Sequence, residues 1–505
     1  MKHSARSKVQ SKSESENGMN RSRSVGSEWK DRLIRMELEQ CLLTGSGSVS
    51  SLWERVRFDV YKRIAMERRG ITTGLRQGVY SQKSVAWLVR AGFRVMVQSL
   101  NRNYHVLLRR NRQFVFWCDP RRRLINRQYW DIWLDPLIDR LPPADVLSFE
   151  PPWALNHFEP SHTNKIVFGD VFLGIARVLG ILRPRSLTNY EKRRFAEARH
   201  RILTEFKVDV PVLTLARSAK SVQAWEQRLF VSLFRWIRPK VLFLTVSYAR
   251  ENLIEAARQV GVVSVEIQHG VITPTHMGYS YPNDLKKAAF PDYLLTFGKY
   301  WVESVCYPVE KNRIIELGYP YLTESIVKYS DLPKVPKSVT FVSQGRPAEG
   351  ISKKAVELAM ERRPGIQVRV KLHPIEYSSW KKLNPELHSA SLSGLLKVYD
   401  SDEKPLHEIL AESEIVIGKN STVLFEALLF SCRLFVYELP GHEYMNELIE
   451  NGHAELIRFD CPFPCIEDSK KAGSVDREYF FRSDWQLQFS QFLKNEIGYE
   501  HEKSY

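Results

Sequence analysis

Cysteine is scarce in this sequence, with six residues scattered through 505 positions. A disulfide framework would need a denser pattern, so we expect free thiols and a reducing compartment. Long apolar runs are also lacking, because the most apolar stretch, residues 166–182, contains Asp170 and Arg177. No membrane-spanning helix is therefore predicted. Residues 1–27 mix serine, lysine and arginine without the apolar core of a signal peptide, so nothing indicates export.

Acidic residues are fewer than basic ones, 58 against 74, which gives a formal net charge of +16. Such a surface favours anionic partners: nucleotide phosphates, acidic glycans, lipid head groups or nucleic acid. The arginine clusters at residues 109–112 and 121–123 are typical of a solvated face, or of a face that contacts anionic membrane or a lipid-phosphate-linked acceptor. No known nucleic-acid-binding module is present, so no nucleic-acid partner is expected. A basic nucleic-acid-binding protein remains the non-enzymatic alternative.

Hydrophobic residues form 43% of the chain, which excludes a wholly disordered, collagenous or coiled-coil protein. In the first part, strands are expected at 114–118, 145–149, 240–246, 262–267, 292–297 and 313–317, and helices at 190–206, 218–236 and 251–260. In the second part, strands are expected at 338–343, 367–372, 395–399, 414–418 and 433–437, and helices at 352–362, 406–413, 422–430 and 443–450. Alternating strands and helices predict parallel sheets with right-handed crossovers.

We therefore expect an α/β fold of two doubly wound, Rossmann-like domains that face each other across a central cleft. Residues 1–28 are predicted to be a disordered basic tail, and residues 29–328 an N-terminal α/β domain. Residues 329–337 carry two prolines among charged residues, which is typical of a linker. Residues 338–480 form the predicted C-terminal α/β domain. Residues 481–505 are predicted to contain a helix that packs back on the N-terminal domain.

Chemistry-bearing residues follow several of these strands, at the carboxyl edge where open α/β sheets bind their ligands. Gln268-His269-Gly270 comes directly after strand 262–267. Glycine lets the backbone approach a ligand, and the His269 imidazole can act as a general base or donate to a phosphate or sugar hydroxyl. The alternative is a histidine that only holds a turn.

Lys371-Leu372-His373-Pro374 ends strand 367–372 in the second part. The proline restricts His373 to extended backbone, which projects the imidazole from the strand end. A histidine beside Lys371 at that position suits a pyrophosphate. The alternative is a cap with an ordinary surface lysine.

Gly418-Lys419-Asn420-Ser421-Thr422 opens a helix that contains Glu426. A helix N-terminus with hydroxyl groups favours an anion, although Asn420 or Ser421 could be a simple N-cap. The spacing is not that of a Walker loop. Ser343-Gln344-Gly345-Arg346 ends the first strand of the second part and suits a nucleotide base or phosphate, with a weaker signal.

In their order, these motifs resemble those of GT-B glycosyltransferases of bacterial capsule and lipopolysaccharide biosynthesis. The similarity extends to capsule sugar transferases, sialyltransferases, Kdo transferases and the CDP-glycerol glycerophosphotransferases of teichoic acid synthesis. Those groups share a His-Gly element in the N-terminal domain, and a His-Pro element and a Ser/Thr-rich turn in the C-terminal domain. Gly318-Tyr319-Pro320 also resembles the end of their first domain. The match covers about residues 240–452, and residues 1–239 resemble nothing that we can name.

The resemblance implies transfer of a sugar from a nucleotide-sugar donor to a surface-glycan or lipid-linked acceptor, with inversion. It implies that His373, Ser421 and Thr422 hold the donor phosphates and that Glu426 binds the ribose. His269 would lie near the acceptor and the departing group, as base or electrostatic stabiliser. The expected catalytic residues are His269 and His373, and the expected substrate-binding residues are Gln268, Gly270, Gln344, Arg346, Lys371, Asn420, Ser421, Thr422 and Glu426. Many family members use an N-terminal-domain carboxylate as base, which the sequence does not place; the expected register turns Glu266 away from the cleft.

No Asp-x-Asp metal signature occurs in the cleft motifs, since Asp400-Ser401-Asp402 lies past a strand end and is expected to be a turn. We therefore expect neither a metal ion nor another cofactor, with His373, Lys371 and the helix terminus offsetting the leaving-group charge. Cys461 and Cys465 with His453 form a poor metal pattern. The enzymatic alternative is a CDP-glycerol-type polyol-phosphate transferase. We expect a cytoplasmic protein, with peripheral attachment to the inner face of the membrane left open, as is the donor nucleotide.

Overall fold

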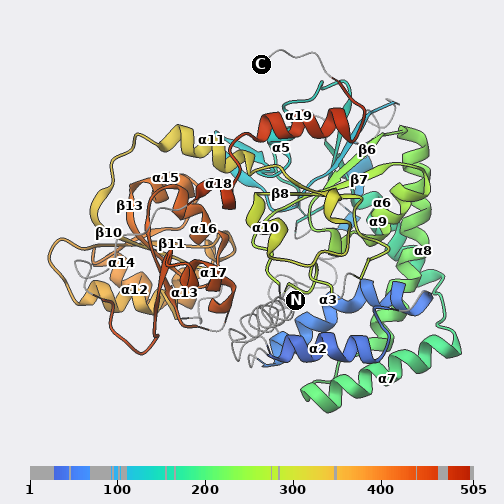
Figure 1. The fold of residues 1–505 in the computed structure, drawn as a ribbon, viewed down its shortest axis with the longest axis horizontal. Helices are drawn as coiled ribbons and strands as arrows, with labels where there is room; N and C mark the ends of the chain where they lie inside the picture. Colours follow the sequence, from blue (N-terminus) through green and yellow to red (C-terminus); the bar gives the residue numbers. More distant parts are fainter. Residues whose placement is uncertain are drawn as a thin grey trace, which may run out of the picture.

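The computed structural model describes residues 28–44, 47–68, 92–93, 96–100, 103, 111–153, 156–163, 166–274, 276–282, 285–345, 350–439, 441–464 and 476–500. The tail predicted over residues 1–28 therefore lies, apart from its last residue, outside the described residues, as does Arg346. Figure 1 shows two α/β units side by side, one built from the first part of the chain and one from the second.

The first unit is built on a seven-stranded parallel sheet. Its strands are β1 (Phe114–Trp117), β4 (Val146–Glu150), β5 (Ile166–Phe168), β6 (Val241–Leu244), β7 (Val263–Ile267), β8 (Tyr293–Thr296) and β9 (Ile314–Glu316). They lie in the order β5-β4-β1-β6-β7-β8-β9. The chain thus winds outward from β1 to β5, returns beside β1 as β6, and winds outward again in the other direction. The sheet is doubly wound, with its switch point between β1 and β6.

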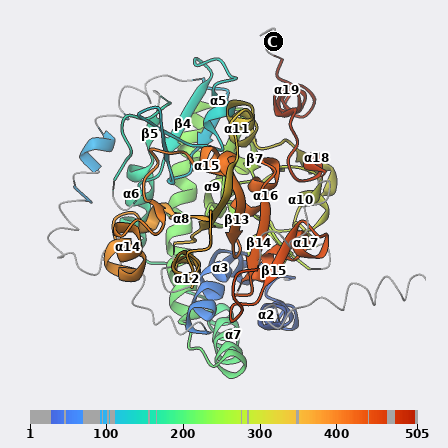
Figure 2. The ribbon, with the colours of Figure 1, turned by 90° about the vertical axis from the view of Figure 1, so that its left-hand side faces the viewer.

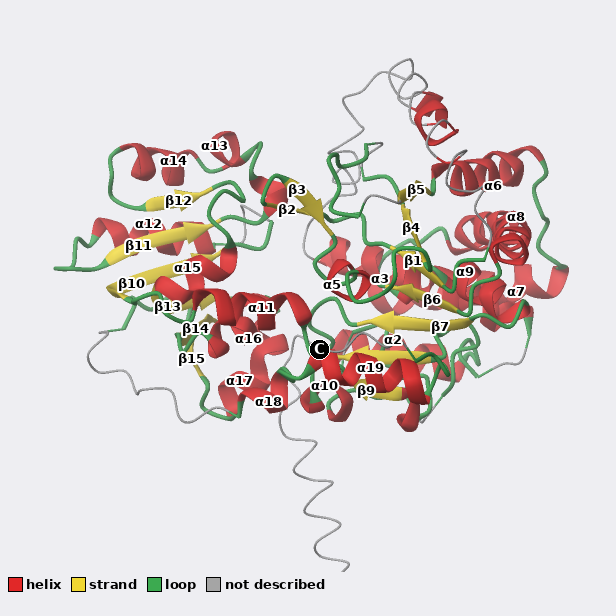
Figure 3. Ribbon diagram, turned by 90° about the horizontal axis from the view of Figure 1, so that it is seen from above, coloured by secondary structure: helices red, strands yellow, loops and turns green. Residues whose placement is uncertain are grey.

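The second unit repeats this plan with six parallel strands. They are β10 (Val335–Val342), β11 (Gln367–Lys371), β12 (Lys397–Tyr399), β13 (Ser413–Gly418), β14 (Arg433–Tyr437) and β15 (Ala454–Ile457). The order β12-β11-β10-β13-β14-β15 places the switch point between β10 and β13. Figure 3 shows the two sheets next to each other, with helices on both faces of each. The predicted fold class, two Rossmann-like α/β domains in a GT-B arrangement, is confirmed.

Helices follow most strands. In the first unit these are α5 (Asp135–Ile138), α6 (Asp170–Leu182), α8 (Val212–Ile237), α9 (Glu251–Gln259) and α10 (Lys299–Glu303). In the second they are α12 (Ile351–Met360), α13 (Trp380–Leu383), α14 (Pro385–Leu392), α15 (Leu406–Glu412), α16 (Thr422–Leu429) and α17 (Asn446–Glu450). A short antiparallel hairpin of β2 (Arg123–Ile125) and β3 (Gln128–Trp130) follows β1. Of the helices in the described ranges, none has the length and apolar character needed to cross a membrane.

The connections between the units differ from expectation in two places. Helix α11 (Pro320–Tyr329) leads out of the first unit, and β10 begins at Val335, inside the segment expected as linker. Pro336 is tolerated there because the pairing of β10 with β13 is interrupted between Val335 and Val339. On the return, α18 (Arg477–Phe480) already contacts the first unit, since Trp301 Nε1 donates to the Phe480 carbonyl at 2.7 Å. The crossing thus precedes the boundary expected at residue 480.

The last helix, α19 (Trp485–Asn495), lies on the first unit. The ring of Phe489 lies 5.9 Å from that of Phe243, and Phe492 meets Tyr293 edge-on at 5.4 Å between ring centres. The apolar core that these side chains enter continues into α16 of the second unit, where Phe425 packs on Trp301. The two units therefore share an apolar contact.

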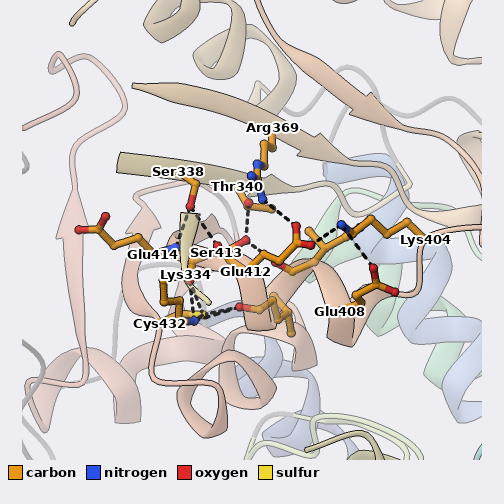
Figure 4. A network of polar contacts seen from close by, with 12 residues as sticks. Lys334, Ser338, Thr340, Arg369, Lys404, Glu408, Glu412, Ser413, Glu414 and Cys432 are labelled. Atoms are coloured by element: carbon orange, nitrogen blue, oxygen red, sulfur yellow. Dashed lines mark hydrogen bonds and ion pairs between the residues drawn. The ribbon is translucent and has the colours of Figure 1, made fainter. Parts of the chain in front are cut away.

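A polar network holds the start of the second sheet together (Figure 4). Lys334 Nζ donates to the carbonyl oxygens of Leu410 and Ser413, at 3.1 and 2.7 Å, where α15 ends and β13 begins. A cation at a helix C-terminus is favoured by the helix dipole. Burial raises the pKa of the neighbouring Cys432 thiol to about 11, so this thiol is unreactive at neutral pH. The network lies at the amino end of β13. Through it, Lys334, in the segment that connects the two units, is held to the second sheet.

A helical layer of which the sequence analysis predicted only one member covers one end of the first unit. It consists of α2 (Glu28–Glu39), α3 (Ser48–Arg68) and the predicted α7 (Asn189–Phe206), which lie together in both Figure 1 and Figure 2. The buried carboxylate of Glu37 accepts hydrogen bonds from Arg57 Nε and Nη2, at 2.8 and 2.9 Å, and from Trp53 Nε1 at 2.8 Å. Arg57 Nη1 donates to the Met277 carbonyl at 2.8 Å. The layer thereby holds the loop that follows β7.

We expect Glu37→Gln to lower the free energy of unfolding by about 3–5 kcal/mol, because it leaves the buried Arg57 charge without its carboxylate. The control is Glu39→Gln on the same helix, whose half-exposed carboxylate pairs with Arg201; its expected loss is below about 1 kcal/mol. Urea unfolding followed by circular dichroism measures both. Equal losses for the two variants would contradict the role given to the buried pair.

Candidate functional site

The carboxyl edges of the two sheets meet. The backbone N–H of Val271, in the loop after β7, donates to Thr422 Oγ1 at the start of α16, at 3.2 Å. Arg123, after β1, lies 3.9 Å from Asp402, after β12. Loops from both sheets therefore border one cleft. Gly270 lies where the two loops meet, since a Cβ placed there would make an ordinary contact with Thr422 Oγ1 at 3.5 Å.

Both switch points open on this cleft. Residues that follow β1 and β6 lie at the switch point of the first sheet, and Gln344 and Asn420, which follow β10 and β13, lie at that of the second. In doubly wound sheets the crevice at the switch point is where ligands bind. The predicted motifs of the second unit thus lie at its switch point or, for His373, one strand away. His269 lies one strand from the switch point of the first unit.

His269 is half-buried between the rings of Trp133 and Tyr248, whose centres lie 6.2 and 6.5 Å away. Burial, and then the positive charge of Arg121, lower the pKa of the imidazole to about 3. His269 is therefore neutral at physiological pH when the cleft is empty. A neutral imidazole has one nitrogen with a hydrogen and one with a free lone pair, so the tautomer decides what it can do.

Tyr279 determines which nitrogen of His269 carries the hydrogen. Its buried hydroxyl donates to Glu266 Oε1, which also accepts from Ser247 N at 3.0 Å. The Tyr279 oxygen lies 3.4 Å from His269 Nδ1. Since the hydroxyl hydrogen is directed to Glu266, the oxygen accepts from Nδ1–H, and the lone pair is left on Nε2. Tyr279 was not singled out from sequence, and only its closeness in the chain to His269 could have suggested it. Glu266 was considered there only as a base, with a register expected to turn it away from the cleft; its carboxylate instead accepts from Tyr279.

Gln268 corrects an expectation. Its side chain is fully buried, with Nε2 donating to the Gly270 carbonyl and Oε1 accepting from Phe297 N, both at 2.8 Å. Both polar atoms of the Gln268 amide are thus hydrogen-bonded to the backbone. Gln268 shapes the loop that carries His269 and does not face a substrate.

His373 follows β11, and its side chain is partly exposed to solvent. Its Nδ1 accepts from Ile375 N at 3.3 Å, so the hydrogen of the neutral ring is on Nε2, which can donate. Partial burial, and then the charges of Arg123 and Arg121, lower its pKa to about 4. Gly345 has a φ of 77°, and a Cβ there would lie 3.1 Å from His373 Nδ1. The ring therefore needs glycine at that position of the neighbouring loop.

Glu376, missed by the sequence analysis, joins the loops after β10 and β11. Its Oε2 accepts from Ser343 Oγ at 2.5 Å, Gly345 N at 3.2 Å and His373 N at 3.0 Å. The spacing of His373 and Glu376 is that of a capping box, which the structure forms. That spacing is the signal that could have identified Glu376.

Lys371 is buried, and its ammonium already has protein partners. Nζ donates to the Tyr377 hydroxyl at 2.7 Å and to the Ser401 carbonyl at 2.6 Å, and Asp402 lies 3.9 Å away. Burial lowers its pKa to about 8. Direct contact between Lys371 and a ligand, as predicted, would require these hydrogen bonds to break.

The N-terminus of α16 carries two hydroxyl groups. Ser421 Oγ caps the helix by accepting from Val423 N at 3.3 Å, and Thr422 Oγ1 accepts from Val271 N. Both oxygens act as acceptors in these bonds, so both hydroxyl hydrogens remain for a ligand. Among the described residues, Gln344 Nε2 and Asn420 Oδ1 are buried without a hydrogen-bond partner. Other buried side-chain atoms of the described residues also lack one; these two are noted because they lie at the switch point.

Glu426 is nearly buried, and its Oε2 lies 2.9 Å from His407 Nε2. The sequence analysis did not identify His407. Asp400 and Asp402 accept from Trp380 Nε1 and the Tyr377 hydroxyl, at 2.9 and 2.8 Å, which fixes this segment as the predicted turn. In the described ranges, no three His, Cys, Asp or Glu side chains are arranged to hold a metal ion, and the five cysteines found there are free thiols; Cys465 lies outside these ranges.

No family model and no curated protein matches the sequence. Among solved structures, UDP-GlcNAc 2-epimerase from Neisseria meningitidis bound to UDP-GlcNAc gives a TM-score of 0.43 with 12% identity, covering 76% of this chain and 99% of that chain. MurG from Acinetobacter baumannii gives 0.36 with 7% identity, covering 69% and 86%. The wall teichoic acid polymerase TagF gives 0.34 with 11% identity, covering 71% and 80%. Likenesses this remote assign no activity.

The low pKa of His269 makes folding sensitive to acid. The unfolded chain binds a proton at a histidine pKa of about 6.5, whereas folded His269 does not until about pH 3, so stability is lost as the pH falls through this window. We expect His269→Asn to retain about 2 kcal/mol more of its stability on going from pH 7.5 to pH 5 than the wild type. Urea unfolding at both pH values measures this, with exposed His200→Asn as control. Identical pH dependence in all three proteins would show that His269 is solvated.

Proposed function

We propose that the protein is a glycosyltransferase that moves a sugar from a nucleotide-sugar donor to an acceptor hydroxyl in this cleft. One arrangement supports the proposal: a histidine lone pair belongs to the carboxyl edge of the first sheet, an anion-binding set belongs to that of the second, and the two edges are in contact through Val271 and Thr422. The first is His269 Nε2. The second combines His373 Nε2–H with the Ser421 and Thr422 hydroxyls at the N-terminus of α16, where the helix dipole favours negative charge.

The second unit is the donor side in this proposal. His373 and the hydroxyls bind the phosphates, and the unpaired Gln344 Nε2 and Asn420 Oδ1 take polar atoms of the nucleoside. Glu426, held by His407, accepts from the ribose hydroxyls. Because His373 is neutral in the empty cleft, it begins as a hydrogen-bond donor. Phosphate charge raises its pKa, so that it stabilises the departing diphosphate more strongly as charge develops.

The first unit is the acceptor side. His269 Nε2 accepts the proton of the acceptor hydroxyl, and the resulting imidazolium is stabilised through Nδ1–H, Tyr279 and the Glu266 carboxyl group. The oxygen freed of its proton attacks the sugar carbon from the side opposite the phosphate, which gives inversion. We propose a glycan or lipid-linked acceptor of the cell surface, met at the inner face of the membrane. Product analysis separates this reaction from the polyol-phosphate transfer that similar phosphate-binding parts would serve.

The two histidines should respond differently to substitution. His373→Ala removes a donor to a charged group, worth about 1.5–3 kcal/mol, so nucleotide affinity and turnover should both fall. His269→Ala should leave nucleotide affinity nearly unchanged and lower turnover by about 10²–10⁴, the range for a lost acid–base group. Calorimetry with the nucleotide, beside rates on the same proteins, tests both.

Loss of nucleotide binding in His269→Ala but not in His373→Ala would reverse the donor and acceptor sides. Normal binding and turnover in both variants would contradict the glycosyltransferase assignment.

Tyr279→Phe tests the positioning of His269. Without the hydroxyl, Nδ1–H loses its acceptor and the ring is free to change tautomer, so we expect kcat to fall by about 10–100-fold with unchanged nucleotide affinity. The matched control is Tyr307→Phe, a buried neighbour whose hydroxyl donates to the Trp301 carbonyl at 2.8 Å instead. Steady-state rates across pH distinguish a positioning effect, which alters the pH profile of kcat, from a simple loss of folded protein. Equal effects of the two variants would refute the role of Tyr279.

A further inference from the structure

We propose that Arg121 and Arg123 are the residues by which the first unit contributes to the phosphate site. Asp402 pairs with Arg123 until the donor nucleotide binds, and the phosphates then take the place of Asp402. The inference rests on the proposed function and adds two further anion ligands to it. The sequence pattern alone was typical of a solvated face, or of a face that contacts anionic membrane or a lipid-phosphate-linked acceptor.

Both arginines lie at the switch point of the first sheet. They follow β1, and Arg123 begins the hairpin β2–β3, which Figure 3 shows at the junction of the two units. From there Arg123 reaches Asp402 of the second unit, at 3.9 Å. The arginines therefore belong to the edge that faces the donor side.

Arg121 is held in place before any ligand arrives. Its Nε and Nη2 donate to the two carboxylate oxygens of buried Asp119, at 2.8 and 2.6 Å, and its guanidinium lies 5.0 Å from the ring centre of Trp133. Within the described part of the chain, Nη1 has no hydrogen-bond partner. A guanidinium whose position is already fixed loses little conformational entropy when it binds a phosphate oxygen.

Arg123 is held more loosely. Its distance of 3.9 Å from Asp402 Oδ1 is an ion pair beyond hydrogen-bond range, and the guanidinium makes no hydrogen bond to another described residue. Asp402 Oδ1 also accepts from the Tyr377 hydroxyl at 2.8 Å and lies 3.9 Å from Lys371 Nζ. Asp402 keeps these partners if Arg123 turns away. A phosphate that receives the planar guanidinium by two parallel hydrogen bonds is a better partner than this long pair.

The charge of Arg121 acts on both histidines, and that of Arg123 acts on His373. After burial, the larger cause, the charge of Arg121 lowers the pKa of His269, and the charges of Arg123 and Arg121 lower that of His373. Positive charge thus converges on the position assigned to the phosphates. An anion there relieves the repulsion, and by the same coupling it raises the pKa of His269. The base is weak while the cleft is empty and strengthens once the donor is bound.

The experiment uses the full chain and four probes, CMP, CDP, UDP and GDP, titrated by calorimetry. The tightest of them is then used for all variants. The Arg123→Gln substitution should weaken nucleotide binding at least tenfold. Arg123→Lys keeps the charge but loses the planar guanidinium, so its nucleotide affinity should lie between those of the wild type and Arg123→Gln. Arg127→Gln, at the exposed turn of the same hairpin, is the matched control and should bind as the wild type does.

The Asp402→Asn variant tests whether Asp402 competes with the nucleotide phosphates for Arg123. The amide oxygen still accepts from Tyr377, but the carboxylate no longer competes for Arg123, so we expect severalfold tighter nucleotide binding. In the Arg123→Gln background this gain should disappear, because the two residues act through one contact.

Three outcomes would overturn the inference. Unchanged nucleotide affinity in Arg123→Gln, in a wild type that binds the nucleotide, contradicts it and leaves the proposed function standing. Unchanged nucleotide affinity with a raised KM for the acceptor assigns the arginines to an acceptor phosphate and contradicts the donor assignment. A wild type that binds none of the four probes contradicts the proposed function itself.

Discussion

Reversal of the winding direction beside the central strand of each sheet is the constraint on which the cleft depends. A parallel sheet that winds in one direction covers its carboxyl edge with successive connections. When the chain returns beside β1 as β6, and beside β10 as β13, the connections diverge and leave that edge open. Two such edges brought together by Val271 and Thr422 produce a site between rigid sheets, and short loops suffice to place side chains in it.

Neutral histidines in a basic cleft are the second physical theme. Burial and the nearby guanidinium groups both disfavour imidazolium, so the empty cleft stores positive charge on arginines that cannot lose it and keeps its histidines unprotonated. Such a site attracts an anion by charge and orients it by directional donors. The two neutral histidines have opposite tautomers, because His269 contacts Tyr279 and His373 contacts the Ile375 N–H. His269 can therefore accept a proton, and His373 can donate a hydrogen bond.

The fold class could be predicted because buried parallel strands are short continuous apolar runs, and every strand predicted from such a run is present in the structure. The strands missed in the two sheets, β5 and β15, are short and lie at sheet edges. Helices α2 and α3 were missed because Glu37 and Arg57 occupy buried positions. Charges that are buried as a pair interrupt the apolar periodicity by which an amphipathic helix is recognised.

For the site, sequence could place motifs at strand ends but could not say which side chains face the cleft. Gln268 and His269 are neighbours, yet one is used by the backbone and the other borders the cleft. That difference depends on the carbonyl of Gly270 and the N–H of Phe297, which a motif does not contain. Tyr279 contacts Glu266 and His269, and Arg121 contacts Asp119 and the Trp133 ring, through tertiary structure that a motif does not encode. Only Glu376 had a signal in its spacing from His373.

The hydrogen bond from Arg57 to the Met277 carbonyl has a consequence for how this chain can be divided. A shortened version beginning at β1 would retain every strand of both sheets, and by secondary structure it would pass as a complete two-domain enzyme. It would nevertheless lack the guanidinium that braces the turn two residues before Tyr279, and with it the stiffness of the support behind His269. The smallest unit that preserves the geometry of the cleft is therefore larger than the smallest unit that preserves the fold.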